Sequence, residues 1–290
     1  MFNTENSNIS SQLNNTRDLN RFNQKTPQSR IISTVIEFNP QQTTDGHIID
    51  VGLIFRHLSD LGFQSLKQSN HLLTPIIKQG RLKQIRPLAI HHNDLPLRAV
   101  AKGKMTDEQL GCAKADLFSA QGEKLYSLKL NYQLQNQLQN QLQKNQHLPP
   151  HSETTHTGDT SQTNHNLYSP NLTGVIISPP IDATATCPPL SQQQCATWHN
   201  HAHNVPQDVL IEQCLALAKV FLKCKNANLD SAYVLRKVNF TSIKNALAGQ
   251  ELTINTHLSA QSGPFEPSFN FDCSVYANQQ RIAEITIELM

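Results

Sequence analysis

Segments with strand-like or helix-like apolar spacing alternate along the chain, and polar stretches with little core character separate them. Ile31–Phe38 is rich in β-branched residues and predicts a strand, which Asn39 and Pro40 close. Between Gly46 and Leu66 the apolar residues recur at helical spacing, and Asp45 is available as the N-cap of that segment. The pattern predicts one strand followed by one long helix.

Four strand-like runs follow this helix in the first half of the chain. They cover residues 81–92, 95–105, 111–120 and 123–134. The short turn Gln121-Gly122 joins the last two runs and is typical of a β-hairpin. The first half is therefore predicted to have the element order β-α-β-β-β-β.

The second half repeats this order. A strand is expected at 174–178, a helix at 204–223, and four strand-like runs at 232–240, 250–259, 268–277 and 280–289. The turn at 120–124 and the turn at 277–281 stand at the same place in each half. The same shift carries the helix that follows Asp45 onto the helix that follows Ala202. Two landmarks that agree in this way indicate an internal structural repeat.

Length and polarity divide the chain further. With 290 residues the chain is about twice the usual single-domain length, so two domains are expected. Residues 1–30 are dominated by Asn, Gln, Ser and Thr and predict a disordered segment, and residues 133–170 predict a Gln/Asn/His-rich linker. The predicted domains are 31–132 and 171–290.

Charge and cysteine usage narrow the classes of protein. The 24 basic and 22 acidic residues leave a formal charge of +2, too small a field to favour nucleic acid or an anionic membrane as a partner. The six cysteines form no C-x-x-C pair and four lie in apolar segments, which indicates reduced core thiols. A secretory signal is not expected, because residues 1–15 have neither a basic start nor an apolar run. A membrane span is not expected, because the most apolar helix, 209–222, is short and carries charges. These features predict a cytoplasmic protein.

One segment carries a family resemblance. A strand, a long buried helix and an antiparallel meander is the order of the hotdog fold. Within the second half, residues 198–212 resemble the C-terminal repeat of the A-factor biosynthesis hotdog family, whose motif runs roughly F-D-H-P-V-D-H-V-P-G-M-V-L-L-E-A-A-R-Q. The segment is also similar to the hotdog dehydratases of fatty-acid synthesis. The residues that match the motif are Val205, Pro206, Val209, Leu210 and Glu212, with Trp198 as a conservative aromatic.

Three departures from the motif bear on chemistry. Its second histidine falls on Asn204, its glycine on Gln207, and its Arg-Gln pair on Leu215-Ala216. Arg56 and His57, on the first helix, echo that Arg-Gln pair by residue type only, which makes Arg56 a candidate substrate-binding residue.

The resemblance implies an α+β fold of two tandem hotdog units, a double hotdog in which an antiparallel sheet wraps one long central helix in each half. The halves would pack as an intramolecular pseudo-dimer, with higher oligomers left open.

The family moves a β-ketoacyl group from acyl-carrier protein to a phosphorylated alcohol, and no cofactor is implied. A dehydratase or thioesterase acting on acyl-carrier protein or acyl-CoA is the alternative, and a non-catalytic acyl-thioester-binding protein is the third. Whether the chain is an enzyme stays open at this point.

Glu212 is the leading catalytic candidate. It lies about two turns into a mostly apolar helix, where a carboxylate requires a partner or a raised pKa, as a general base does. The competing interpretation places it on a solvated stripe beside Gln213 and Lys219. Since related hotdogs pair a histidine of one unit with a carboxylate of the other, the resemblance favours His47 with Glu212 as a composite site, and His203 as the substitute for His47.

The start of the second helix offers further binding residues. Asn204, as the expected N-cap, and Val205 mark where backbone N–H groups would polarise a thioester carbonyl. His199, His201 and His203 alternate and could face one side of an extended segment. Without a nearby Cys or Glu at ligand spacing a metal site is not expected, so these histidines are either catalytic or substrate-orienting groups or solvated loop residues. Asp50 is a candidate second carboxylate, but its position favours the other interpretation, a stabilising acidic residue in the first turn of a helix.

Overall fold

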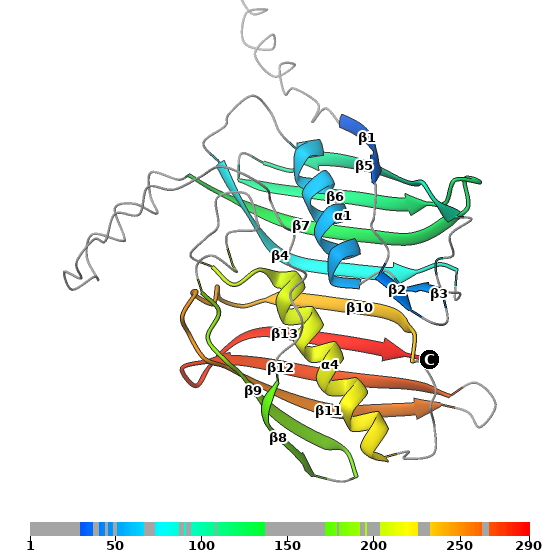
Figure 1. Cartoon of the computed structure of the whole chain (residues 1–290). Helices are drawn as coiled ribbons and strands as arrows, with labels where there is room; N and C mark the ends of the chain where they lie inside the picture. Colours follow the sequence, from blue (N-terminus) through cyan, green and yellow to red (C-terminus); the bar gives the residue numbers. More distant parts are fainter. Residues whose placement is uncertain are drawn as a thin grey trace, which may run out of the picture.

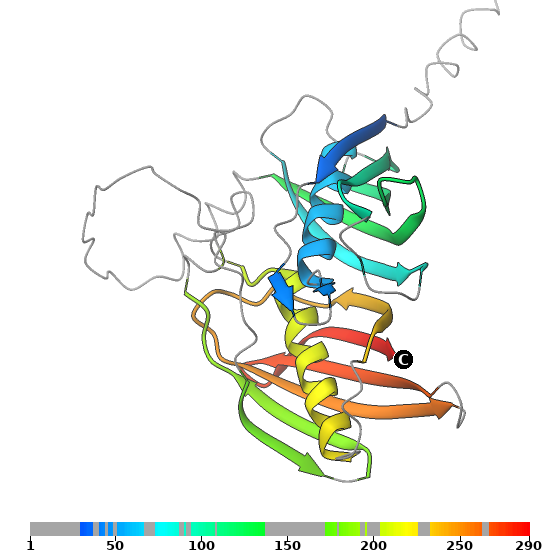
Figure 2. The same cartoon turned by 45° about the vertical axis from the view of Figure 1, so that its right-hand side comes forward.

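The computed structural model describes two helices lying on one face of a single large sheet (Figures 1 and 2). The residues that it describes are 30–36, 41–43, 46–48, 51–66, 73–86, 90, 94–107, 109–136, 172–178, 180–191, 195, 204–225, 233–262 and 267–290. Eleven strands form the main sheet, and a separate hairpin adds two short strands.

The first half holds one helix and seven strands. Their bounds are β1 Arg30–Ile36, β2 Gln41–Thr43, β3 Gly46–Ile48, α1 Val51–Leu66, β4 Leu73–Gln84, β5 Leu97–Met105, β6 Leu110–Phe118 and β7 Lys124–Asn136. The short strands β2 and β3 pair only with each other. Figures 1 and 2 both place this hairpin beside the end of α1 that faces the second half.

The second half holds the other helix and six strands. Their bounds are β8 Thr173–Ser178, β9 Asp182–Cys187, α4 Gln207–Lys225, β10 Leu235–Ser242, β11 Leu252–Ser262, β12 Ser268–Ala277 and β13 Gln280–Leu289. The expected strands at 268–277 and 280–289 are confirmed residue for residue. Buried side chains alternate with less buried ones along all of β12 and from Ala283 onward in β13, the pattern of a sheet with one face on the core.

The strand order shows that the two halves are arranged with approximate two-fold symmetry around one join. The order is β1-β5-β6-β7-β4 and then β10-β13-β12-β11-β9-β8, so β4 and β10 connect the halves as antiparallel neighbours. In that join Gly80 pairs with Phe240, and Lys83 pairs with Lys237. The shift in residue number that carries Ala120 onto Ala277 carries Gly80 onto Lys237 and Lys83 onto Phe240, so each pair is the image of the other. The register is therefore its own image, as an isologous two-fold contact requires.

The core lies between the sheet and the helices. Buried residues of β5, β6 and β7 face α1, and those of β9, β11, β12 and β13 face α4. The Tyr132 hydroxyl donates a 2.6 Å hydrogen bond to the carbonyl oxygen of Ser59, which ties α1 to β7. Phe221 of α4 meets Phe271 of β12 edge to face, with ring centroids 5.8 Å apart. Each such fully buried aromatic contributes about 1.5–3 kcal/mol through removal from water, so the core anchors both helices.

Two sequence expectations need correction, and one strand was missed. The first helix begins at Val51, not near Gly46, because residues 46–48 pair with 41–43 as a hairpin and cannot also be helical. The strand expected at 81–92 is β4, which starts at Leu73 and ends at Gln84, since it follows β7 and β10 over their length. The strand β9 was not expected. Its alternation of small residues, Asp-Ala-Thr-Ala-Thr-Cys, carries little apolar signal although Ala183, Ala185 and Cys187 are buried.

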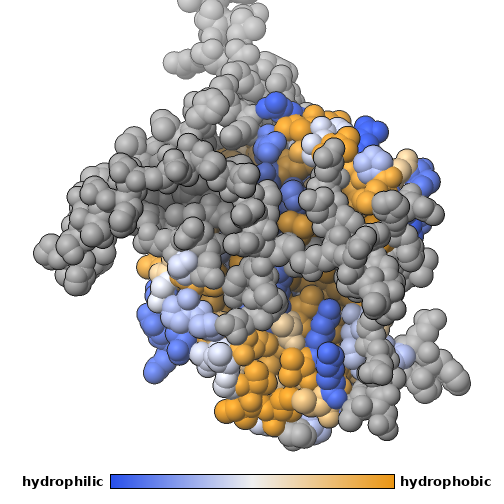
Figure 3. Space-filling model, in the orientation of Figure 1, coloured by the Kyte–Doolittle hydropathy of each residue, from blue (hydrophilic) through white to orange (hydrophobic). Residues whose placement is uncertain are grey.

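The two edges of the sheet carry exposed apolar side chains. Figure 3 shows the face that bears the helices, with apolar surface gathered at its lower end around β8 and β9. There Ile176 is 64% exposed, and on the opposite edge strand, β1, Ile31 is 66% exposed. Such edges are the places through which sheets extend.

Three further expectations, on membrane spans, the linker and the cysteines, can be compared with the described residues. None of the described helices is long and apolar enough to cross a bilayer. The strand β7 continues to Asn136, four residues into the expected linker, and residues 137–171 lie outside the described part of the chain. All six cysteines are free thiols, and Cys187, Cys195, Cys214 and Cys273 are buried, as expected of core thiols.

Candidate functional site

The two helices meet through their N-terminal turns, beside the β4–β10 join (Figures 1 and 2). Gly52 and Arg56 come from the first two turns of α1, and Asp208 and Glu212 come from the first two turns of α4. We call these four residues the helix junction. Because helix N-termini carry unpaired N–H groups and a partial positive charge, this is a place that favours anionic groups.

Glu212 reaches across the junction to α1. Only 7% of the residue is exposed. A Cβ atom added to Gly52 would lie 1.7 Å from Glu212 Oε1 and 2.2 Å from its Cδ, so only glycine leaves room for the carboxylate at this position. The interpretation of Glu212 as a residue of a solvated stripe is therefore wrong, and the neighbouring Gln213 is fully buried as well.

Asp208 forms a buried ion pair with Arg56. Arg56 Nε donates to Asp208 Oδ2 at 2.9 Å, and Arg56 Nη2 donates to the same oxygen. The Asp208 side chain is 0% exposed and that of Arg56 is 23% exposed. Burial raises the pKa of Asp208, although the charge and hydrogen bonds of Arg56 oppose that shift.

The second oxygen of Asp208 is an open acceptor. Oδ1 is buried and has no hydrogen bond of ordinary geometry among the described residues, although the N–H groups of Asp208 and Val209 lie close enough to the carboxylate to lower its pKa. A buried acceptor left without a donor costs about 1–3 kcal/mol, so such atoms usually mark a place where a ligand or water donates. Asp208 and Glu212 are one helical turn apart on the same face of α4, which places two carboxylates side by side.

The start of α4 differs from expectation. Asn204 forms an isolated antiparallel bridge with Leu247, and the N–H of Val205 donates to the carbonyl of Ala246 at 2.9 Å. The carbonyl of Pro206 accepts the first helical hydrogen bond, from the N–H of Leu210 at 3.4 Å. Asn204 is therefore not the N-cap, because its backbone belongs to the bridge and the helix starts at Gln207.

A small cavity lies at this helix start. Its volume is about 30 Å³, room for about one water molecule. It is lined from both halves by Pro75, Ile76, Asn204, Val205, Pro206, Gln207 and Asn245. Two predicted binding residues, Asn204 and Val205, thus share a cavity with β4 of the other half.

The histidines are placed less completely. The backbone of His47 pairs with Gln42 in the β2–β3 hairpin, while its side chain is outside the described part of the structure. His199, His201 and His203 lie outside the described residues as well, so their roles stay predictions. No group of three metal-ligating side chains occurs among the residues that are described. Asp50 also falls outside them.

Two residues of the junction were missed from the sequence. Asp208 lies within the motif segment at a position where the family has a methionine, and an aspartate in the first turn of a helix is ordinary. Gly52 gave no signal either. The role of each becomes visible only when α1 and α4 are brought together.

Nearby thiols are not nucleophiles at neutral pH. Burial, and to a lesser degree the charge of Asp208, raises the pKa of Cys195 to about 11. Burial raises the pKa of Cys187 to about 12, and its thiol donates to Gln213 Oε1 at 3.4 Å. Because the thiolate is the reactive form, neither group supports covalent catalysis.

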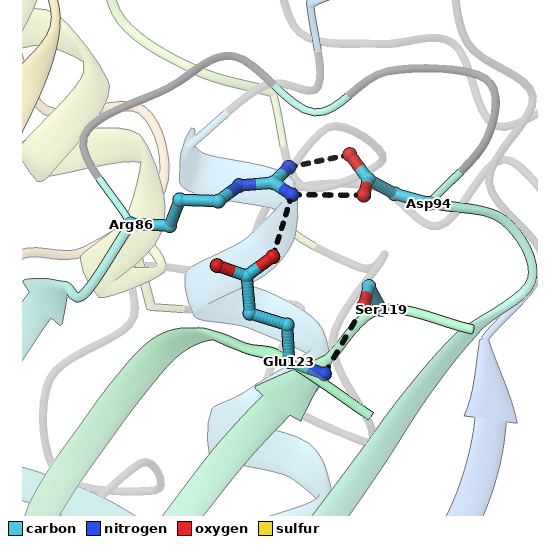
Figure 4. Close-up of polar contacts among 4 residues, drawn as sticks. All are labelled: Arg86, Asp94, Ser119 and Glu123. Carbon is cyan, nitrogen blue, oxygen red and sulfur yellow. Dashed lines mark hydrogen bonds and ion pairs between the residues drawn. The ribbon is translucent and has the colours of Figure 1, made fainter. Parts of the chain in front are cut away.

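A second charged cluster, shown in Figure 4, is paired within itself. Both terminal nitrogens of Arg86 donate to Asp94, and Nη1 also donates to Glu123 Oε2 at 3.0 Å. The N–H of Glu123 donates to Ser119 Oγ at 3.2 Å. The hydrogen bond to Asp94, opposed by burial and aided by Glu123, raises the pKa of Arg86. The cluster joins the segment after β4 to the β6–β7 turn and has the features of a structural network.

Comparisons with known proteins show the fold. A putative oleoyl thioesterase from Lactobacillus plantarum aligns over 91% of this chain and 97% of its own, with 11% identity and a TM-score of 0.52. The tesB protein of Mycobacterium avium subs. paratuberculosis aligns over 90% and 92%, with 9% identity and a TM-score of 0.56. The scan against protein-family models and the search of curated proteins gave no match. Both alignments cover at least nine tenths of the chain with TM-scores above 0.5, and this likeness of fold supports the hotdog fold that the sequence predicts.

Proposed function

We propose that this chain is an acyl-thioester hydrolase built as a tandem hotdog, with its reactive centre at the helix junction. The supporting observation is the pair of buried carboxylates, Asp208 and Glu212, which face the N-terminal turns of the opposite helix. In this proposal residues 31–132 and 171–290 each supply one hotdog unit, and residues 133–170 connect them. The structures of similar fold that carry thioesterase names add support to hydrolysis.

The junction residues suit the proposed chemistry. Glu212, as general base, removes a proton from water while the water oxygen attacks the thioester carbonyl carbon. First-turn N–H groups stabilise the negative charge that develops on the carbonyl oxygen. The carbon–sulfur bond then breaks, and the thiol leaves with the proton that Glu212 took up. Arg56 holds Asp208, whose open oxygen positions the water, so Arg56 acts as a positioning residue.

Transfer to a phosphorylated acceptor is a weaker proposal. That reaction, implied by the resemblance to the A-factor family, requires a cation that binds the acceptor's phosphate. Arg56 is the cation at the junction, and its guanidinium is already bound to Asp208. Dehydration is the second candidate, because the same glutamate with a histidine such as His47 or His203 would remove a proton and a hydroxyl group from a 3-hydroxyacyl thioester.

Product analysis tests the proposal. The full chain is incubated in ¹⁸O-labelled water with CoA thioesters of short, medium and long saturated chains and of 3-hydroxy acids, and the products are identified by mass spectrometry. Hydrolysis predicts free acid with one ¹⁸O atom together with free thiol. An enoyl thioester as the main product would replace hydrolysis by dehydration. Binding of the thioesters without any product would leave a non-catalytic binding protein and contradict the proposal.

A further inference from the structure

One row of cross-strand neighbours on the first half of the sheet consists of cations. Lys102 on β5 pairs with Lys114 on β6, Lys114 pairs with Lys129 on β7, and Lys129 pairs with Arg81 on β4. All four side chains are exposed. We call these four residues the cation row. Like charges directly opposite each other on a sheet are destabilising, so the cation row lowers the stability of the fold. A role in binding would explain why the chain has it.

The cation row faces away from the helix. The alternate residues on the same strands face α1: a Cβ atom added to Gly103 would lie 2.3 Å from Ser65 Oγ, and one added to Gly111 would lie 2.9 Å from Leu66. Since successive side chains of a strand point to opposite faces, Lys102 and Lys114 point to the outer face. The site is thus separate from the helix junction.

These cations are poorly compensated. Lys114 Nζ contacts Asp116 Oδ2 at 3.2 Å, an oxygen that it shares with Lys124. Lys102, Lys129 and Arg81 have no ion-pair or hydrogen-bond partner within the part of the chain that the structure describes. Lysines at this density, with Asp116 as the one acidic partner that they contact among the described residues, favour an anion from outside the chain.

The outer face is hollowed at this point. A depression of about 500 Å³ is lined by Lys102, Lys104, Lys114 and Lys129, with Cys112 and Asn131 between them. Cys112 pairs directly with Lys104 on one side and Asn131 on the other, and its short side chain leaves the space that the longer lysines enclose. The volume is within the usual range for sites that take small molecules.

We propose that this depression binds a small molecule bearing a diphosphate or triphosphate group. Adjacent strands are about 4.8 Å apart, so ammonium groups from three strands reach one compact anion with several charges. Lysine binds phosphate as a point charge from any direction, which suits a cluster without a fixed fork of donors. Asn131, whose amide nitrogen donates to Gln79 Oε1 at 3.2 Å, adds a polar side chain to the rim.

Nucleic acid fits the surface less well. Proteins that bind single strands place aromatic side chains under successive bases, and no aromatic residue lines the depression.

Protection of Cys112 from alkylation tests the proposal at the site itself. The full chain is treated with iodoacetamide with and without inorganic tripolyphosphate, and the modification of each cysteine is followed by mass spectrometry. At ten times the dissociation constant, bound anion should slow alkylation of Cys112 about tenfold. Cys224 is the internal control, because it is exposed between Lys223 and Lys225 but lies on α4. ATP and coenzyme A, run as separate arms, distinguish the sources of the phosphate groups.

Matched variants complete the test. Lys102→Gln/Lys129→Gln should abolish the protection of Cys112. Lys83→Gln/Lys237→Gln removes the same charge from two directly opposed lysines outside the depression and should leave protection intact. Equal protection of Cys112 and Cys224, or equal loss in both variants, would overturn the proposal in favour of unspecific ionic attraction. Protection by single-stranded DNA but not by tripolyphosphate, ATP or coenzyme A would overturn it in favour of a nucleic-acid surface.

Discussion

The two halves share a frame but differ in chemistry where their helices meet. The shift that superimposes the β6–β7 and β12–β13 turns places Phe55 at the position of Glu212 and Val209 at the position of Gly52. The contact between Gly52 and Glu212 therefore has an apolar image, Val209 with Phe55. Both image residues are fully or almost fully buried. The repeated order of strands on either side of the β4–β10 join gives two corresponding positions, and this chain has a carboxylate at one of them and buried apolar side chains at the other.

The ion pairs are equally one-sided. The image of Arg56 is Gln213 and that of Asp208 is Val51, so the buried pair of the junction has no counterpart across the two-fold axis. The Arg86 network is likewise confined to the first half. Its image positions hold Ile243, Glu251 and Gln280. This asymmetry provides matched control positions within one chain.

The largest effect is expected from breaking the junction pair. Arg56→Met leaves the Asp208 carboxylate buried without its cation, which should lower the free energy of unfolding by about 3–5 kcal/mol. Arg281→Met breaks an exposed pair with Glu284 and should cost no more than about 0.5 kcal/mol. Urea denaturation measures both. If Arg56→Met matched the control, Asp208 would not be a buried charge.

A smaller effect should follow from the network of Figure 4. Arg86→Met removes the partner of the nearly buried Asp94 and should destabilise by about 2–3 kcal/mol. Ile243→Met, at the image position, changes a partly exposed apolar side chain and should stay within about 0.5 kcal/mol. Equal melting temperatures for the two variants would contradict the structural role of the network.

Gly52→Ala should damage the junction by overpacking. The new methyl group occupies the space of the Glu212 carboxylate, which predicts a loss of about 1–2 kcal/mol and a displaced general base. The double variant Gly52→Ala/Glu212→Ala should recover the stability but not the activity. A double variant as unstable as Gly52→Ala alone would show that the methyl group clashes elsewhere.

The pH dependence of stability should have opposite sign for one aspartate of each half. For Asp116 burial raises the pKa, but hydrogen bonds from Ser127 and Lys124 outweigh it, so the pKa lies below its ordinary value. Relative to Asp116→Asn, the wild type should gain stability as the pH rises from the pKa of folded Asp116 to the higher pKa of the unfolded chain. Because Asp116 is partly exposed, the gain should be less than about 1 kcal/mol.

For Asp208 the sign reverses. Its raised pKa means that the folded state holds the proton more tightly than the unfolded state. Relative to Asp208→Asn, the wild type should therefore lose stability as pH rises from the ordinary pKa through the folded one. Urea denaturation at steps between about pH 3 and about pH 7 checks both slopes. Slopes of the same sign would mean that burial does not govern Asp208.

The spacing of apolar residues within single segments was enough to predict most of the longer helices and strands. The strands β12 and β13 follow from strict alternation between turn residues, and α4 follows from its long apolar run, although it begins three residues later than Asn204. The short hairpin was missed because Gly46–Ile48 is as compatible with a helical period as with a strand. Glu212 was found through the motif, which is a local signal.

The remaining features depend on contacts between distant segments. Gly52 matters only because α1 and α4 meet at the β4–β10 join, and no spacing within either helix encodes that meeting. The cation row joins residues that are far apart in the chain. It requires the registers of four strands, and a net charge of +2 conceals it. Sequence patterns thus predict the elements, and the pairing of the elements determines the sites.

The turnover of Glu212→Gln tests most directly the claim that the chemistry depends on the Glu212 carboxylate, whose corresponding position in the first half is the apolar Phe55. The variant keeps the shape of the side chain and removes its charge, so hydrolysis of the best acyl-CoA substrate should fall by about 10²–10⁴-fold. The melting temperature should change by no more than about 4 °C. Glu284→Gln, on the exposed outer face, should leave both unchanged. Turnover of Glu212→Gln within a few-fold of the wild type would contradict the account.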